Sequence, residues 1–171
     1  LTILMVIAGL CLGAAYTVTK DPIARQEAEQ KEMARKAVLE EAVSFEEVQL
    51  TDGGNVQECY RGLDTAGNPC GYAMSVTAKG FGGDIQLTVG VKDGVVTGVR
   101  IGTHSETPGL GARAAEEKFY GQFTGKSGTL SVIKTGEAGD SEINAITAAT
   151  ITSTAVTNAV NEALDCAAGL N

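Results

Sequence analysis

Five hydroxyl side chains crowd a short segment near the C-terminal end of the chain, where a helix is predicted to begin. They are Thr147, Thr150, Thr152, Ser153 and Thr154. The N-terminus of a helix presents unpaired backbone N–H groups and the positive end of the helix dipole, so it can bind a phosphate. A helix needs only one cap, so capping explains only part of the cluster. The GxxxxGK[ST] and GxGxxG motifs are absent from the sequence, so the common nucleotide sites are not indicated.

A second segment, 104–111, follows a predicted strand and is rich in residues that allow close backbone approach. Its residues are His104, Ser105, Glu106, Thr107, Pro108, Gly109, Leu110 and Gly111. Glycine removes side-chain bulk where a flat ligand approaches the backbone. An ordinary loop has the same composition, so the residues alone leave both interpretations open. Glu106 could hydrogen-bond a ligand or cap the loop, and a single His without a nucleophile does not predict catalysis.

The elements that must position these two segments are predicted from periodicity and turn residues. The runs 56–62, 70–78, 84–92 and 95–103 are typical of strands, and Asp93-Gly94 is a strong hairpin signal. A short helix is expected at 113–120 and a further strand at 129–133. A long helix with an apolar stripe begins at about Thr150. The predicted fold class is α+β, an antiparallel sheet with helices packed against it.

The N-terminal part differs from the rest of the chain. Leu1–Val18 contain no charged side chain, and a helix of this length measures ~27 Å, close to the hydrocarbon thickness of a bilayer. A single transmembrane helix over 1–19 is therefore predicted, in preference to a cleaved signal peptide or a buried core helix. Asp21-Pro22 is a good helix start and predicts a stalk helix over 20–45. Residues 46–171 are expected to form the folded domain.

Charge and cysteine content limit the classes of function. The 13 Lys and Arg residues against 21 Asp and Glu residues give a net charge of −8, which argues against a nucleic-acid partner. The sequence has no CxxC pair, so an iron–sulfur cluster bound by this chain alone is not indicated, and no metal site is predicted. Cys59 and Cys70 flank the predicted turn 64–69 and could form a disulfide if they lie opposite each other.

Two stretches, taken together, resemble a known family. They are AKGFGGDIQLTVGVKDGVVTGVRIGTHSETPGLGAR at 78–113 and AITAATITSTAV at 145–156. Both are similar to the FMN-binding domain of electron-transport subunits, a family that includes the G subunit of the Rnf complex and the C subunit of the sodium-pumping NADH:quinone reductase. The ETPGLG segment at 106–111 is a specific part of this resemblance.

The resemblance implies a covalently bound cofactor. The family's flavinylation motif, D-x-x-[ST]-G-A-T, aligns with Asn144–Thr150, so that Thr150 would carry FMN through a phosphoester bond. Asn144 and Ala148 stand where the family has Asp and Gly. The positions that match are Thr147 and Ala149, followed by Thr152 and Ser153. The loop 105–111 would support the isoalloxazine ring, and a separate flavin transferase would deliver the FMN. No catalytic residue is implied in this chain.

The resemblance also implies a role as a redox subunit of an ion-translocating complex. The chain is compact and lacks larger insertions, which favours the G subunit of the Rnf complex, a ferredoxin:NAD⁺ oxidoreductase, over the C subunit of the quinone reductase. The expected partners are the other membrane and peripheral subunits, the flavin transferase and membrane lipid. A single-pass protein of the bacterial cytoplasmic membrane is expected, with the FMN domain on the extracytoplasmic face. The alternative is a membrane-anchored structural or binding module without flavin, whose hydroxyls only cap a helix.

Overall fold

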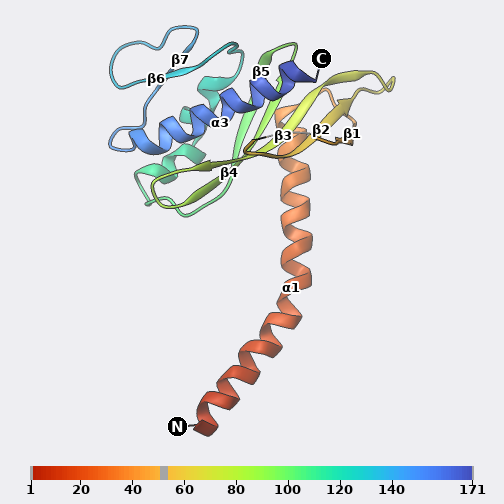
Figure 1. Ribbon diagram of the computed structural model, residues 1–171, viewed down its shortest axis with the longest axis vertical. Helices are drawn as coiled ribbons and strands as arrows, with labels where there is room; N and C mark the ends of the chain where they lie inside the picture. Colours follow the sequence, from red (N-terminus) through yellow and green to blue (C-terminus); the bar gives the residue numbers. More distant parts are fainter. Residues whose placement is uncertain (1, 51–53, 171) are drawn as a thin grey trace. The chain divides into compact units, whose positions relative to one another are not determined.

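A five-stranded antiparallel sheet forms the centre of the folded part of the chain. The computed structural model describes residues 2–50 and 54–170. The strands neighbour one another in chain order, and a long helix, α3 (Thr150–Gly169), packs across the third and fourth strands (Figure 1). The strands are β1 (Ser44–Val48), β2 (Val56–Leu63), β3 (Pro69–Lys79), β4 (Asp84–Lys92) and β5 (Val95–His104). The α+β prediction is confirmed, and β1 is a strand that the sequence pattern did not predict.

The turn between β4 and β5 has the backbone that its sequence predicted. Asp93 and Gly94 have φ values of 51° and 75°, and two consecutive positive φ angles are the signature of the hairpin turn that suits twisted strands. The register then pairs Lys92 with Val95. On β4, Ile85, Leu87 and Val89 are buried in the main core.

Short elements connect β5 to the last helix. They are the 3-10 helix η1 (Gly111–Ala115), the helix α2 (Glu117–Tyr120), the 3-10 helix η2 (Gly121–Phe123), and the parallel pair β6 (Ser131–Ile133) and β7 (Glu142–Asn144). The helix expected at 113–120 is therefore divided in two, and the strand expected at 129–133 is confirmed as β6. The helix predicted from Thr150 is α3 (Thr150–Gly169), whose Val156, Val160 and Ala163 are fully buried in the main core.

The N-terminal helix differs from the two segments that were predicted there, a span over 1–19 and a stalk helix over 20–45. Helix α1 (Thr2–Val38) is continuous through Pro22, so the helix start predicted at Asp21-Pro22 is wrong, and α1 ends before residue 45. The chain divides into two compact units, Leu1–Met33 and Ala34–Asn171. Among the residues that the structure describes, no helix combines the length and the apolarity needed to cross a membrane, so the predicted span is not confirmed.

The last residues of α1 and the residues that follow it belong to the folded unit and pack on the sheet. Val38 and Leu39 are buried, and Leu39 forms a small second core with Ala42 and Cys70. A row of four glycines makes room for this chain segment. The glycine row consists of two pairs of glycines that lie opposite each other on neighbouring strands: Gly62 with Gly71, and Gly90 with Gly98. A Cβ atom on Gly90 would overlap the carbonyl group of Val38, so a larger residue does not fit there.

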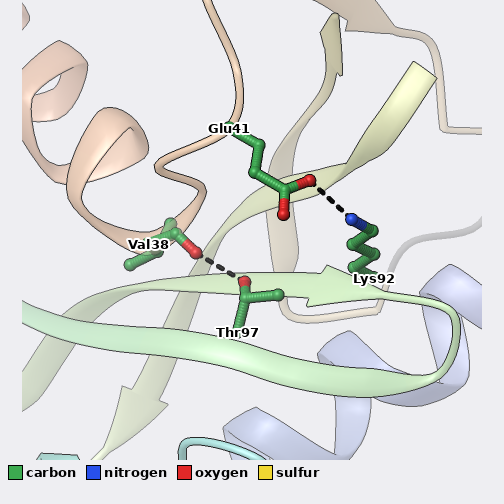
Figure 2. A network of polar contacts seen from close by, with 4 residues as sticks. All are labelled: Val38, Glu41, Lys92 and Thr97. Carbon is green, nitrogen blue, oxygen red and sulfur yellow. Dashed lines mark hydrogen bonds and ion pairs between the residues drawn. The ribbon is translucent and has the colours of Figure 1, made fainter. Parts of the chain in front are cut away.

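Polar contacts hold the same segment in place. The Thr97 hydroxyl donates a hydrogen bond to the Val38 carbonyl oxygen at 2.5 Å, and the Lys92 ammonium group lies 2.5 Å from a carboxylate oxygen of Glu41 (Figure 2). The first contact satisfies a carbonyl group that the end of α1 leaves without an intrahelical partner. The second is exposed and contributes little to stability.

Candidate functional site

The structure brings the two segments singled out in the sequence to one cavity. The cavity has a volume of about 380 Å³ and lies where the loop after β5 meets the first turn of α3. Its walls come from three parts of the chain: Phe81, then Glu106, Thr107, Leu110 and Gly111, then Ala148, Ala149, Thr150, Ile151 and Thr152. The predicted residues Ser105, Pro108, Gly109, Thr147 and Ser153 are not part of this lining.

Glu106 connects the three parts of the cavity wall. Its side chain is only 6% exposed. One carboxylate oxygen accepts a hydrogen bond from the Gly82 N–H at 2.8 Å, and the other accepts one from the Thr152 hydroxyl at 2.6 Å. The carboxylate therefore fastens the turn before β4 and the first turn of α3 to its own loop. Of the two roles considered for Glu106, these contacts fit the structural one.

Close packing at Gly111 explains why the loop carries glycine there. A Cβ atom on Gly111 would overlap the Glu106 carboxylate and lie 2.8 Å from the Thr152 hydroxyl oxygen. Gly109 has a φ of 77°, a conformation that glycine adopts without strain. The loop is thus shaped by its own packing, and Leu110 remains 41% exposed at the cavity.

The N-terminus of α3 has no side-chain cap among the described residues. The residue before the helix is Ala149, which has no side-chain oxygen. Ser153 is turned inward instead, where its hydroxyl accepts from the Ile146 N–H and donates to the Ala149 carbonyl, both at 2.9 Å. The capping interpretation of the hydroxyl cluster is therefore wrong for this helix end. The first backbone N–H groups of α3 remain available to bind an anion.

The structure separates the clustered hydroxyls by their surroundings. Thr152 and Ser153 are buried, and their hydroxyls bond inside the fold. Thr147 and Thr154 are exposed, and Thr147 lines a different cavity of about 210 Å³ together with Arg113 and Asn144. Thr150 is half-buried, lines the main cavity and makes no hydrogen bond through its hydroxyl within the described part of the chain. Among the five clustered hydroxyls, the Thr150 hydroxyl is therefore the one that faces this cavity without a hydrogen-bond partner in the described part of the chain.

Ala148 has an unusual backbone conformation next to the site. Its φ is 63°, in the left-handed region that residues with a Cβ atom rarely adopt. This is the position at which the resembling motif has Gly. The geometry supplies a physical reason for glycine there, because glycine has no steric penalty in this region.

Phe81 is a cavity residue that the sequence pattern does not reveal. The sequence pattern places it only in the connection between the predicted strands 70–78 and 84–92. The structure places it in the cavity wall with 71% of its surface exposed. Apolar periodicity identifies buried side chains, so it could not identify Phe81, which is exposed. The sequence feature that could have drawn attention to Phe81 is an aromatic residue placed between glycines in a connection between strands.

The disulfide considered between Cys59 and Cys70 is wrong. The register pairs Cys59 with Met74, and Cys70 lies next to Gly71, the partner of Gly62. The two thiols also belong to different core clusters, and both are free. Burial raises the pKa of Cys59 to about 12, so this thiol is neutral.

In the described part of the chain, no group of three or more His, Cys, Asp or Glu residues is arranged to hold a metal ion.

Fold and site together define an α+β cofactor-binding domain, in which a loop and an uncapped helix N-terminus face one partly apolar cavity. The family model of the FMN-binding domain matches residues 80–165, which include Phe81, the loop 105–111 and Thr150. The chain belongs to this family.

The sequences of several relatives align with almost the entire chain. The G subunit of the ion-translocating oxidoreductase complex of Methanosarcina acetivorans is 36% identical over 96% of this chain and 89% of its own length. The G subunit of the Na⁺-translocating ferredoxin:NAD⁺ oxidoreductase complex of Acetobacterium woodii is 36% identical over 94% and 85%. The corresponding G subunit of Clostridium ljungdahlii, whose complex is named as proton-translocating, is 32% identical over 96% and 86%.

Solved structures share the fold. The C subunit of the Na⁺-translocating NADH–quinone reductase from Parabacteroides distasonis superposes with a TM-score of 0.53 at 25% identity, over 64% of this chain and 59% of that chain. NqrC of Shewanella oneidensis has a TM-score of 0.54 at 19% identity, over 72% of this chain and 66% of that chain. The second similarity concerns the fold alone.

Proposed function

We propose that this chain is the G subunit of an ion-translocating ferredoxin:NAD⁺ oxidoreductase complex, and that it carries FMN bound through a phosphoester to Thr150. The observation that carries the proposal is the position of the Thr150 hydroxyl. In the described structure, it is the one hydroxyl of the cluster that both lines the cavity and has no hydrogen-bond partner. The C subunit of the quinone reductase is less well supported, because the G-subunit relatives match a larger share of both chains.

The donor groups and the cavity walls fit FMN. The uncapped N-terminus of α3 offers backbone N–H groups for a phosphate, and the exposed apolar surfaces of Leu110 and Ile151 suit an aromatic ring. FMN supplies one- and two-electron redox chemistry. The residues of this chain position the cofactor and keep water from its ring. Glu106 fixes the loop and the helix end relative to each other.

Attachment and assembly require other proteins. A flavin transferase would deliver the FMN, and the remaining subunits of the complex would donate and accept the electrons. The relatives' names include both Na⁺ and proton translocation. The family therefore does not by itself determine which ion this chain's complex moves.

We also propose that the N-terminal segment 1–19 anchors the protein in the cytoplasmic membrane, with the FMN domain outside. The support is the absence of charged residues from Leu1–Val18 and the ion translocation in the relatives' names. Lys20, Arg25 and Lys31 follow this segment and alone would favour the cytoplasm, but large domains are translocated largely regardless of such charges. Protease added to intact spheroplasts should degrade the domain. Full protection would contradict this topology.

The attachment site is tested with a matched pair of variants. Thr150→Val keeps the β-branched shape and removes the oxygen, and Thr154→Val makes the same change at an exposed position outside the cavity lining. Each variant is co-expressed with the transferase, and flavin fluorescence is recorded in a denaturing gel. We expect Thr150→Val to lose the fluorescent band and Thr154→Val to keep it. A fluorescent Thr150→Val band would transfer the assignment to Thr147 or Thr152, and a non-fluorescent parent protein would indicate a module without covalent flavin.

A further inference from the structure

Exposed apolar side chains of the folded unit gather around the cavity beside Thr150. In the described residues from Ala34 onward, the large apolar side chains with high exposure are Val43, Phe81, Leu110 and Ile151. All of them except Val43 line this cavity. Exposed apolar surface that is concentrated in one place marks a surface that a ligand or partner covers.

Phe81 is the most exposed of these side chains, yet its backbone is firmly held. The Gly80 N–H donates to the Gly83 carbonyl at 2.9 Å, which closes the turn. The Gly82 N–H is bound to the Glu106 carboxylate at 2.8 Å. A Cβ atom on Gly82 would lie 3.0 Å from the Cα atom of Glu106, so the turn packs directly on the loop 105–111. Phe81 is therefore fixed relative to the loop while its ring remains uncovered.

The cavity wall offers apolar surface from separate elements. Phe81 comes from the turn between β3 and β4, Leu110 from the loop after β5, and Ile151 from the first turn of α3. A planar aromatic ligand has two apolar faces, and an aromatic side chain stacks well on such a face. Thr150 lines the same cavity, so a ligand attached to its hydroxyl would lie next to these apolar side chains.

We propose that Phe81 covers one face of the isoalloxazine ring of the flavin carried by Thr150. The inference rests on the proposed function and adds a cofactor-contacting residue that lies outside the loop 104–111 and outside the hydroxyl-rich segment. The occupant favoured by the observations is the flavin ring and not an apolar side chain of another subunit, because Phe81 and Thr150 line one cavity of about 380 Å³.

The absence of Trp from the sequence permits a sharp test. An indole ring in contact with an excited flavin quenches its emission by donating an electron, and this quenching requires close contact. Phe81→Trp is compared with Phe45→Trp, which places the same residue in β1, beside the small core of Leu39, Ala42 and Cys70. Both full-length variants are co-expressed with the transferase, and folding is checked by circular dichroism.

Flavin emission is measured for each native protein and divided by its emission after denaturation. We expect this ratio to fall several-fold in Phe81→Trp relative to the parent protein and to remain unchanged in Phe45→Trp. Equal ratios in the two variants would overturn the proposed contact while leaving covalent flavin at Thr150 intact. A parent protein without flavin in a denaturing gel would overturn both proposals.

A second variant gives an independent measurement. Phe81→Ala removes the ring from an exposed position, and the measurement is made on the molecules that carry covalent flavin. Uncovering the flavin should then raise the quenching of its emission by iodide ions in solution. Unchanged iodide quenching would show that Phe81 does not cover the ring.

Discussion

Ala148 shows how a single backbone angle links stability to the candidate attachment site. With φ at 63°, Ala148 pays a steric penalty that glycine avoids. We expect Ala148→Gly to raise the free energy of unfolding by about 0.5–1 kcal/mol, measured by thermal denaturation of the flavin-free protein. Ala149→Gly is the matched control. Ala149 has a φ of −134° and is buried, so this substitution should lower stability. A lower stability of Ala148→Gly would show that the left-handed conformation is not strained.

Cys59 predicts how stability depends on pH. Burial raises its pKa from the ordinary thiol value of 9.0 to about 12 in the folded protein. Below pH 9 the thiol is protonated in both states, and its contribution to stability is complete. Between these two values the unfolded chain ionises while the folded chain does not, so stability falls as the pH rises.

The measurement is urea unfolding under reducing conditions at about pH 8 and about pH 10. Burial also raises the pKa values of Cys70 and Cys166, which act in the same direction. Cys59→Ala should therefore reduce the loss of stability between the two pH values without abolishing it. The same loss in the variant and the parent would exclude Cys59 as a cause.

At the scale of single residues, the residue types mark candidate segments but do not reveal how each side chain packs. The hydroxyl cluster and the loop 104–111 could be singled out because hydroxyls and glycines are visible as residue types, whereas the choice of Thr150 within the cluster came from the family resemblance. The inward orientation of Ser153 and the contact of Thr152 with Glu106 depend on packing between segments far apart in the chain. Phe81 had no periodic pattern to identify it.

At the scale of elements, β2 to β5 were predictable because their turn residues and apolar patterns agree. Strand β1 was missed because none of its residues is fully buried, so Ser44–Val48 lack the alternation that identifies a strand. The end of α1 could not be located because helix-forming residues continue past Val38. The helix ends at the point where Val38 and Leu39 become buried, and Val38 there lies against the glycines of the sheet.

The glycine row predicts different losses of stability for substitutions at two of its positions. A Cβ atom on Gly90 would overlap the Val38 carbonyl group, whereas one on Gly98 would lie 3.3 Å from the Val38 Cα atom. We expect Gly90→Ala to lower the free energy of unfolding by about 1–3 kcal/mol and Gly98→Ala to lower it by less. Chemical denaturation of both variants provides the comparison. Equal effects would indicate that the segment shifts freely over the sheet.

At the scale of the whole molecule, the boundary between the two units predicts where the chain can be shortened. A chain that begins at Ala34 retains Val38, Leu39 and Ala42, and it should unfold at the same temperature as the full chain. A chain that begins at Val43 loses these buried residues. Each buried Val or Leu side chain contributes about 1.5–3 kcal/mol, so the shorter chain should be clearly less stable. Identical melting curves for the two shortened chains would contradict the role assigned to the end of α1.

The contacts of Glu106 have a consequence for how the mature protein is made. Both carboxylate oxygens find their partners, Gly82 and Thr152, within the polypeptide. The loop, the turn and the helix end are thus joined by folding alone, before a cofactor arrives. On the proposed function, the transferase modifies a finished protein, and unmodified chains accumulate as a folded pool when its flavin donor is scarce. The supply of flavin then limits how many molecules transfer electrons, without limiting how many are folded.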